Sequence, residues 1–135
     1  YFRMEVKMLE IGICGSAETK VTEENTAKAF CSGALEVFAT PAMLALFEEA
    51  AWKSVAPHLS EGEGTVGTKA ELSHISATPL GGAVRCESRL TEIDGRRLVF
   101  HVEAFDDAGK IGEGTHERFI VQNERFMEKA RTKMK

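Results

Sequence analysis

Three kinds of feature are scarce in this sequence: cysteines, long apolar runs and excess positive charge. Its 135 residues contain three cysteines, an odd number at wide spacings that fits neither a disulfide framework nor a zinc motif. We therefore expect Cys14, Cys31 and Cys86 to be reduced thiols. No apolar stretch reaches the roughly 20 residues of a membrane span, and no basic-then-apolar leader is seen. A cytoplasmic location is expected, with no membrane partner.

The charge balance and the histidine spacing exclude two further classes of site. The formal net charge is -4, which argues against nucleic acid as a partner. The four histidines form no i,i+4 pair and have no companion thiolate, so neither a metal site nor a cofactor is predicted. Gly62, Gly64 and Gly67 resemble a phosphate-binding loop only superficially, because a strand follows them rather than a helix.

The length suits a single domain over residues 1–135, with 123–135 as a short basic helix or tail. The expected class is α+β, with one strand within residues 4–21, a helix from Thr40 to Ala56, and four strands over 65–78, 83–93, 97–105 and 111–122. The turns between these four strands are short, which predicts one antiparallel meander wrapped round the helix. Residues 23–35 fit either a short helix or a loop covering the start of that helix.

The expected helix is apolar but carries two glutamates. Thr40 and Pro41 give a start signal, with the threonine hydroxyl as cap. Glu49 lies one turn before Lys53 and should pair with it in solvent. Glu48 points into an arc formed by Leu44, Ala51, Trp52 and Val55. A carboxylate there needs an explanation, either an arginine across the core or a role in chemistry.

Strand alternation brings a histidine toward the same helix. Within 65–78, Val66, Ala70 and Leu72 share a side with His74, which should therefore face inward. Thr40, Glu48 and His74 then offer a hydroxyl, a carboxylate and an imidazole, the groups that acyl transfer needs beside the free amides of a helix N-terminus. Each also has a purely structural interpretation: a helix cap, an ion pair and a core histidine.

The last strand offers a weaker signal in the sequence GEGTHERF. His116 and Arg118 share strand parity with Gly112 and Gly114. Small residues beside an inward arginine are consistent with a backbone left open for a ligand. Glycines in strands also mark bulges, so the pattern alone favours a structural role slightly.

Several segments resemble a known family: VFAT, APHL, EGEG, ISATP, DGRRL and GTHER, spread over Glu36 to Phe126. They closely resemble the fluoroacetyl-CoA thioesterase group of single hotdog-fold proteins. The resemblance implies a homodimeric acyl-CoA thioesterase with its pocket near the subunit interface. It places the catalytic residues at Thr40, Glu48 and His74, and the residues that help to hold the thioester at Gly67 and Arg118.

One departure from the family concerns the cover ahead of the helix. The family's lid carries a phenylalanine where this chain has Ala34, and Phe30 could substitute only if the cover is shifted. The expected substrate is therefore a short or medium acyl-CoA rather than fluoroacetyl-CoA. The alternative function is a hotdog module that binds acyl-CoA without cleaving it. The residues leave open whether Thr40 or Glu48 is the nucleophile.

Overall fold

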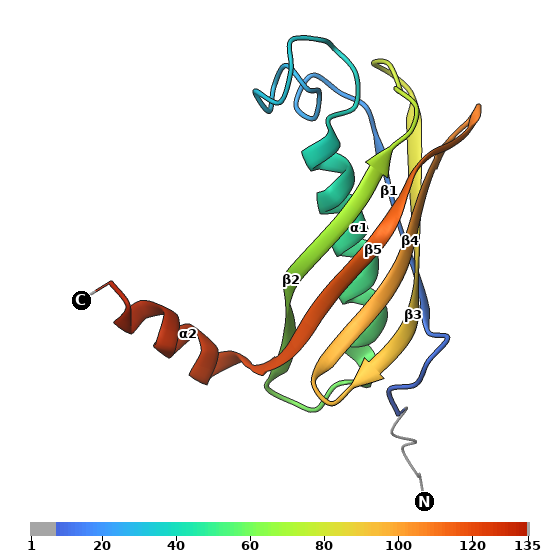
Figure 1. Cartoon of the computed structure of the whole chain (residues 1–135). Helices are drawn as coiled ribbons and strands as arrows, with labels where there is room; N and C mark the ends of the chain where they lie inside the picture. The colour runs from blue at the N-terminus through green and yellow to red at the C-terminus, as the bar shows by residue number, and fades with distance from the viewer. Residues whose placement is uncertain (1–7, 135) are drawn as a thin grey trace, which may run out of the picture.

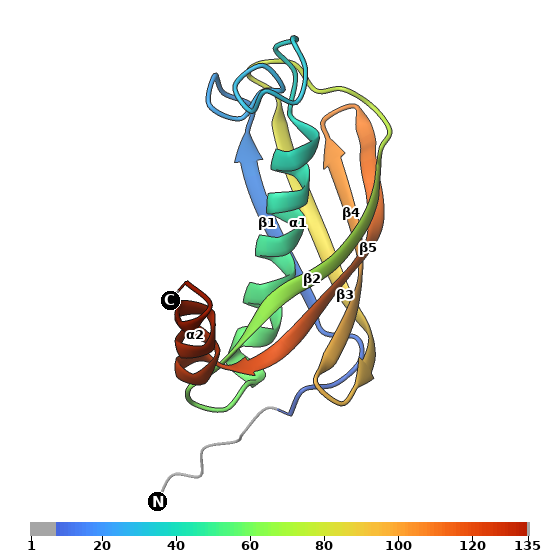
Figure 2. The same ribbon diagram turned by 60° about the vertical axis from the view of Figure 1, so that its left-hand side comes forward.

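A computed structural model describes residues 8–134 as one helix embraced by a curved antiparallel sheet (Figures 1 and 2). The elements in chain order are β1 (Cys14–Lys20), α1 (Thr40–Val55), the 3-10 turn η1 (Ala56–His58), β2 (Glu63–His74), β3 (Ala83–Asp94), β4 (Arg97–Asp106), β5 (Gly109–Gln122) and α2 (Asn123–Thr132). The strands are ordered β1-β3-β4-β5-β2 in a single sheet. The predicted α+β arrangement of a long helix wrapped by a sheet is confirmed.

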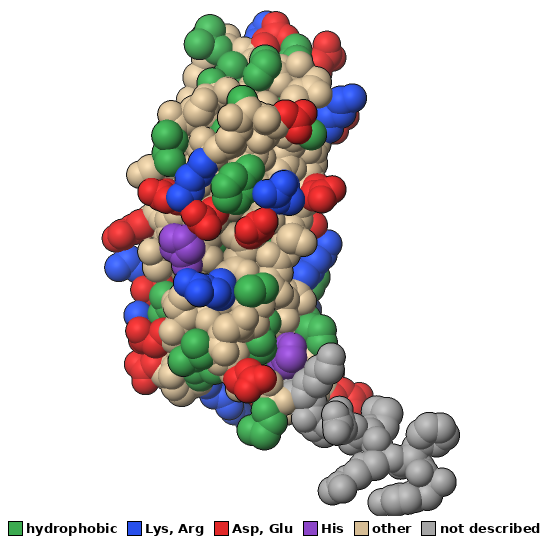
Figure 3. Space-filling view, turned by 90° about the vertical axis from the view of Figure 1, so that its right-hand side faces the viewer, with side chains coloured by type: hydrophobic (Ala, Val, Ile, Leu, Met, Phe, Trp, Pro, Cys, Tyr) green, Lys and Arg blue, Asp and Glu red, His purple; other side chains and the backbone are tan. Residues whose placement is uncertain are grey.

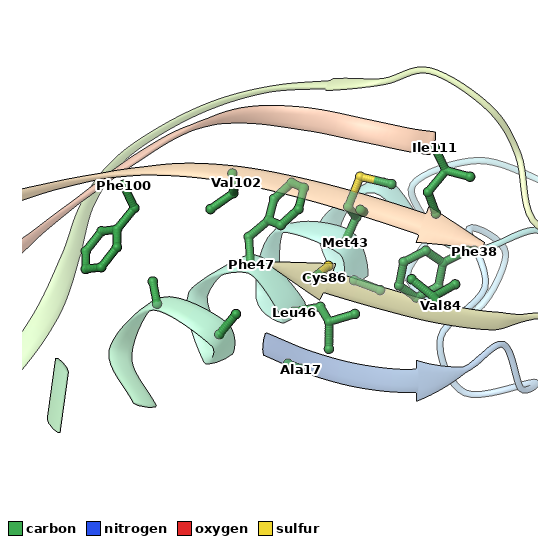
Figure 4. Close-up of a cluster of buried hydrophobic side chains, with 14 of the residues drawn as sticks. Ala17, Phe38, Met43, Leu46, Phe47, Val84, Cys86, Phe100, Val102 and Ile111 are labelled. Atoms are coloured by element: carbon green, nitrogen blue, oxygen red, sulfur yellow. The ribbon is translucent and has the colours of Figure 1, made fainter. Parts of the chain in front are cut away.

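The core lies between α1 and the concave face of the sheet. It contains three fully buried phenylalanines, Phe38, Phe47 and Phe100, together with Met43 and aliphatic residues from β3 and β4 (Figure 4). Along β3 buried and exposed residues alternate strictly from Ala83 to Leu90, so every second side chain faces the core. The outer face of the sheet carries charged side chains of both signs, and Figure 3 shows them intermingled on the side where β3 and β4 lie in Figure 1.

The prediction of one continuous meander is wrong for the connection after β2. Only β3, β4 and β5 follow one another as hairpins, whereas β2 pairs with β5 at one edge and the chain then crosses to β3 near the other. The connection 75–82 is anchored at Thr78, whose carbonyl accepts from the Phe38 amide at 2.8 Å and whose hydroxyl donates to Asp106 Oδ2 at 2.7 Å. It is therefore a packed crossover and not a turn.

A bulge in β2 changes which of its residues face the helix. Gly67 pairs with Arg118 and Lys69 with Glu117, so Thr68 is an extra residue between them. Side-chain parity reverses there, because directly paired residues share a face. Gly67 and His74 therefore lie on the inward face, while Val66, predicted to share that face, lies on the other.

The ends of the chain partly match the expectations. Of the strand expected within 4–21, residues 4–7 lie outside the described residues, 8–13 are not a strand, and β1 begins at Cys14. Residues 23–35 form turns, which selects the loop over the helix. The basic C-terminal segment forms α2, which projects from the end of β5 (Figure 1).

Candidate active site

Thr40 begins α1 but does not cap it, contrary to the sequence-based expectation. The N-cap is Ala39, with extended backbone and no side-chain hydrogen bond, and Thr40 and Pro41 occupy the first helical turn. The threonine side chain points instead toward the end of β2. Its Oγ1 lies 2.7 Å from Nδ1 of His74, so the hydroxyl bonds to a residue of β2 and not to the backbone of its own helix.

His74 is half-buried as the last residue of β2. Burial lowers the pKa of its imidazole, and the nearby Ser76 backbone opposes this only in part. The ring is therefore neutral at neutral pH and has one N–H. Nδ1 accepts the Thr40 hydroxyl when that proton is on Nε2, and it donates when the proton is on Nδ1. The pair is arranged for proton transfer to and from the hydroxyl.

A pocket of about 270 Å³ opens beside this pair. Its wall is formed by the last residue of β2, His74, and the three residues that follow it, and by Val37 and Phe38 before α1. The segment 23–35 contributes Ala27 and Ser32. Phe30 is 45% exposed and does not line the pocket, so no aromatic ring of this segment closes it.

Glu48 lies on the exposed side of α1 rather than in a buried arc. Its side chain is 40% exposed, and Trp52, one turn later, is also exposed, which corrects the prediction for both residues. Oε2 of Glu48 lies 3.3 Å from Nη1 of Arg118, so the arginine alternative is confirmed. The expected surface pair of Glu49 with Lys53 forms at 2.9 Å.

Arg118 comes from β5 and is only 6% exposed. Nε donates to Thr65 Oγ1 at 2.8 Å and Nη2 to the Thr65 carbonyl at 2.9 Å. Burial lowers the pKa of the guanidinium, and Glu48 opposes that shift. Gly67 faces the same place, since a Cβ at Gly67 would lie 2.4 Å from Glu48 Oε2 and 3.3 Å from Arg118 Nη1. Only glycine lets the carboxylate lie this close to β2.

The five site residues predicted from the sequence thus form two groups within one chain. Thr40 and His74 make the first; Glu48, Gly67 and Arg118 make the second. Among residues 8–134 no hydrogen bond or ion pair joins Glu48 to the first group. Thr40 and Glu48 are eight positions apart on α1, about 12 Å at 1.5 Å per residue.

Sequence reasoning did not identify Thr65 as an arginine ligand. The sequence gives little signal for this role, because a threonine inside a glycine-rich run does not show which side chain of a neighbouring strand will contact it. His116, considered only as a weak candidate, lies 3.2 Å from Arg118 and belongs to the second group. Its parity with Arg118 was the one available clue.

Comparison with known proteins identifies the family. The sequence profile of the fluoroacetyl-CoA-specific thioesterases matches residues 21–124. The chain belongs to this family. It is 44% identical over 98 residues to the fluoroacetyl-CoA thioesterase of Streptantibioticus cattleyicolor, an alignment that covers 73% of this chain and 70% of the relative.

Solved structures agree with this assignment. A structure of the fluoroacetyl-CoA thioesterase FlK matches with a TM-score of 0.88 at 34% identity, covering 94% of this chain and 98% of the other. A threonine-to-serine mutant of FlK in complex with acetyl-CoA matches with the same TM-score at 34% identity, over 94% of this chain and all of the other. A thioesterase superfamily member from Thermus thermophilus matches with a TM-score of 0.83 at 30% identity, over 96% and 94% of the two chains. The architecture is the hotdog fold of thioesterases.

Proposed function

We propose that this protein is an acyl-CoA thioesterase that hydrolyses a short or medium acyl-CoA to the free acid and CoA. The observation that carries the proposal is the 2.7 Å contact between Thr40 Oγ1 and His74 Nδ1 beside a pocket of about 270 Å³. A neutral imidazole that is hydrogen-bonded to a hydroxyl can remove a proton from an attacking group. Family membership supports the same chemistry.

The reaction breaks the C–S bond of the thioester and adds water across it. Thr40, or a water molecule bound by Thr40 or Glu48, attacks the carbonyl carbon and gives its proton to His74, which then passes it to the CoA sulfur, so that CoA leaves as the thiol. If the Glu48 carboxylate attacks instead, it releases no proton, and the CoA sulfur leaves as the thiolate and takes a proton from water. Amides of the first turn of α1 have no partner within the helix and are suited to the oxyanion that develops. If a side chain attacks, water hydrolyses the acyl-enzyme in a second step.

We include a homodimer in this proposal, with the second copy beside β2 and α1. β2 is a strand of 12 residues that hydrogen-bonds to β5 on one side only, and residues 67–71 are exposed. Long unpaired edges tend to be covered. The exposed side of α1 next to this edge includes Ala45, Glu48 and Trp52, so a second copy here would cover the Glu48 carboxylate.

Light scattering on the purified protein tests the homodimer. A mass of twice the chain at micromolar concentration supports it, and Ala70→Pro, which removes an amide from the free side of the edge strand, should weaken it. The matched variant Lys20→Pro, at the end of the other edge strand, should leave the dimer intact. A monomer at all concentrations would remove the interface from the proposal.

The function itself is tested by following thiol release from a series of acyl-CoAs of increasing length, including acetyl-CoA and fluoroacetyl-CoA. Turnover should be greatest with a short or medium acyl group, without preference for fluoroacetyl-CoA. Addition of a chelator should not change the rate, since the steps above use only protein groups. A raised melting temperature with acyl-CoA but no free thiol would indicate the binding module instead.

A cytoplasmic location also belongs to the proposal. Cys14, Cys31 and Cys86 are all free thiols, and burial raises the pKa of Cys86 to about 12. Free thiols in this number are typical of a reducing compartment. None of the helices in residues 8–134 is long and apolar enough to cross a membrane.

A further inference from the structure

His116 lies on β5 at the back of the second group, and no step of the proposed reaction uses it. Its side chain is buried, with 2% of the residue exposed. The ring stacks on Phe100, with the two centroids 6.3 Å apart and the planes inclined by 29°. A polar ring in such a place needs hydrogen bonds at its nitrogens, because burial without them is costly.

The first hydrogen bond fixes the position of the ring proton. Nδ1 of His116 lies 2.8 Å from the carbonyl oxygen of Lys69. A carbonyl can only accept, so Nδ1 carries the hydrogen. Burial lowers the pKa of the imidazole; the Lys69 carbonyl opposes this, nearby Arg118 adds to it, and Glu48 and Glu117 oppose it. A neutral ring with its proton on Nδ1 leaves Nε2 as an acceptor.

The second hydrogen bond links the ring to Arg118. Nη1 of Arg118 lies 3.2 Å from His116 Nε2 and 3.3 Å from Glu48 Oε2. Nη1 has two hydrogens, so one goes to each acceptor. Thr65 holds Nε and Nη2. Because the guanidinium is planar, the two Thr65 contacts and His116 fix its orientation together. His116 thereby supports the Nη1 group whose other hydrogen Glu48 accepts.

We propose that His116 is a positioning residue for the thioesterase reaction: as an imidazole protonated on Nδ1 alone, it orients Arg118 and thereby Glu48. This inference rests on the proposed function for its kinetic consequence, but its structural content can be measured separately. The histidine of the GTHER segment thus acts through Arg118 and Glu48, without touching the substrate itself.

Two substitutions separate orientation from packing. His116→Phe keeps a ring against Phe100 but removes both hydrogen bonds, and His116→Gln keeps one donor and one acceptor. We expect kcat to fall about 10- to 100-fold in the phenylalanine variant, with KM changed less than about twofold. The glutamine variant should recover most of the loss. His101→Phe, on the exposed outer face of the sheet, is the matched control and should retain full turnover.

Nitrogen-15 NMR of the unmodified protein tests the orientation without any turnover. The His116 ring should show a protonated Nδ1 and a bare Nε2 at pH 7, and Arg118 should give a guanidinium signal that shifts in His116→Phe and is restored in His116→Gln. The opposite tautomer, a charged ring at pH 7, or equal kcat in all variants would overturn the inference. Absence of thiol release by the unmodified protein, with the expected NMR signals, would instead contradict the proposed function.

Discussion

The hydroxyl of Thr40 and Nδ1 of His74 lie 2.7 Å apart, although 34 positions separate them in the chain. The contact joins the first turn of α1 to the last residue of β2. Both residues belong to the same chain. The pair that we propose to transfer the proton is therefore assembled by the folding of one subunit.

The first prediction concerns the two possible roles of the Thr40 hydroxyl. Because Ala39 is the N-cap, Thr40→Val should change the free energy of unfolding by less than the ~1 kcal/mol typical of losing a capping side chain. It should nevertheless lower kcat about 10²-fold, whereas Thr40→Ser should keep most activity. Urea unfolding and thiol release on the three proteins measure both effects. A large stability loss with normal kcat would restore the capping role.

The second prediction is a pH dependence that arises from His74. Burial holds its pKa below the usual 6.5, and the reaction needs the neutral ring, so kcat should rise with pH through that lowered pKa and be level above about 6.5. Between the two pKa values the unfolded chain binds more protons, so the free energy of unfolding should also fall as pH falls. His74→Gln should lose the rise in kcat. A rise in kcat centred above pH 6.5 would contradict the assignment of His74 as the titrating group.

The third prediction tests the close approach of Gly67 to Glu48. In Gly67→Ala the new Cβ would meet Glu48 Oε2, so the carboxylate must move away from Arg118 and kcat should fall about tenfold. Gly64→Ala on the same strand is the control, since its Cβ would meet the side chain of Asn123 instead. Steady-state kinetics of both variants decide the matter. Equal activity would show that the Glu48 position is not needed.

The fourth prediction concerns the crossover that follows His74. Thr78 is buried and its hydroxyl donates to Asp106, whose carboxylate has a lowered pKa chiefly because of this bond. Thr78→Val should reduce the free energy of unfolding by about 2 kcal/mol, as expected for a hydrogen bond to a charged group. Thr115→Val, at an exposed threonine on β5, should change it by less than about 0.5 kcal/mol. Similar values for the two would mean that the bond does not anchor the crossover.

Much of the fold could be predicted because periodicity and turn residues act locally. The Thr40–Pro41 start, the alternation in β3 and the Asp94–Gly95 turn each specify nearby backbone, and all three agree with the structure. The position of β2 beside β5 could not be predicted in this way. It depends on Thr78 contacting Phe38 and Asp106, groups distant in the sequence.

The site was predictable to a similar degree. The inward direction of His74 was correct, but the bulge at Thr68 reversed the parity of Val66, and nothing in the residue types announces a bulge there. Helical spacing gave the direction in which the Glu48 side chain points, but it could not show how exposed that side of the helix is. Its contact with Arg118 is set by sheet pairing 70 positions away. Motif resemblance, rather than periodicity, connected Gly67 and Arg118 to the site.

We propose that Thr40, His74 and Glu48 serve one hydrolytic reaction. The most direct test is the rate of thiol release from acetyl-CoA and longer acyl-CoAs by His74→Ala and Glu48→Gln, with Glu49→Gln as the control from the exposed neighbour that pairs with Lys53. We predict a loss of about 10² or more in kcat for the first two variants, with their fold intact, and full activity in the control. Near-normal thiol release from both His74→Ala and Glu48→Gln would contradict it.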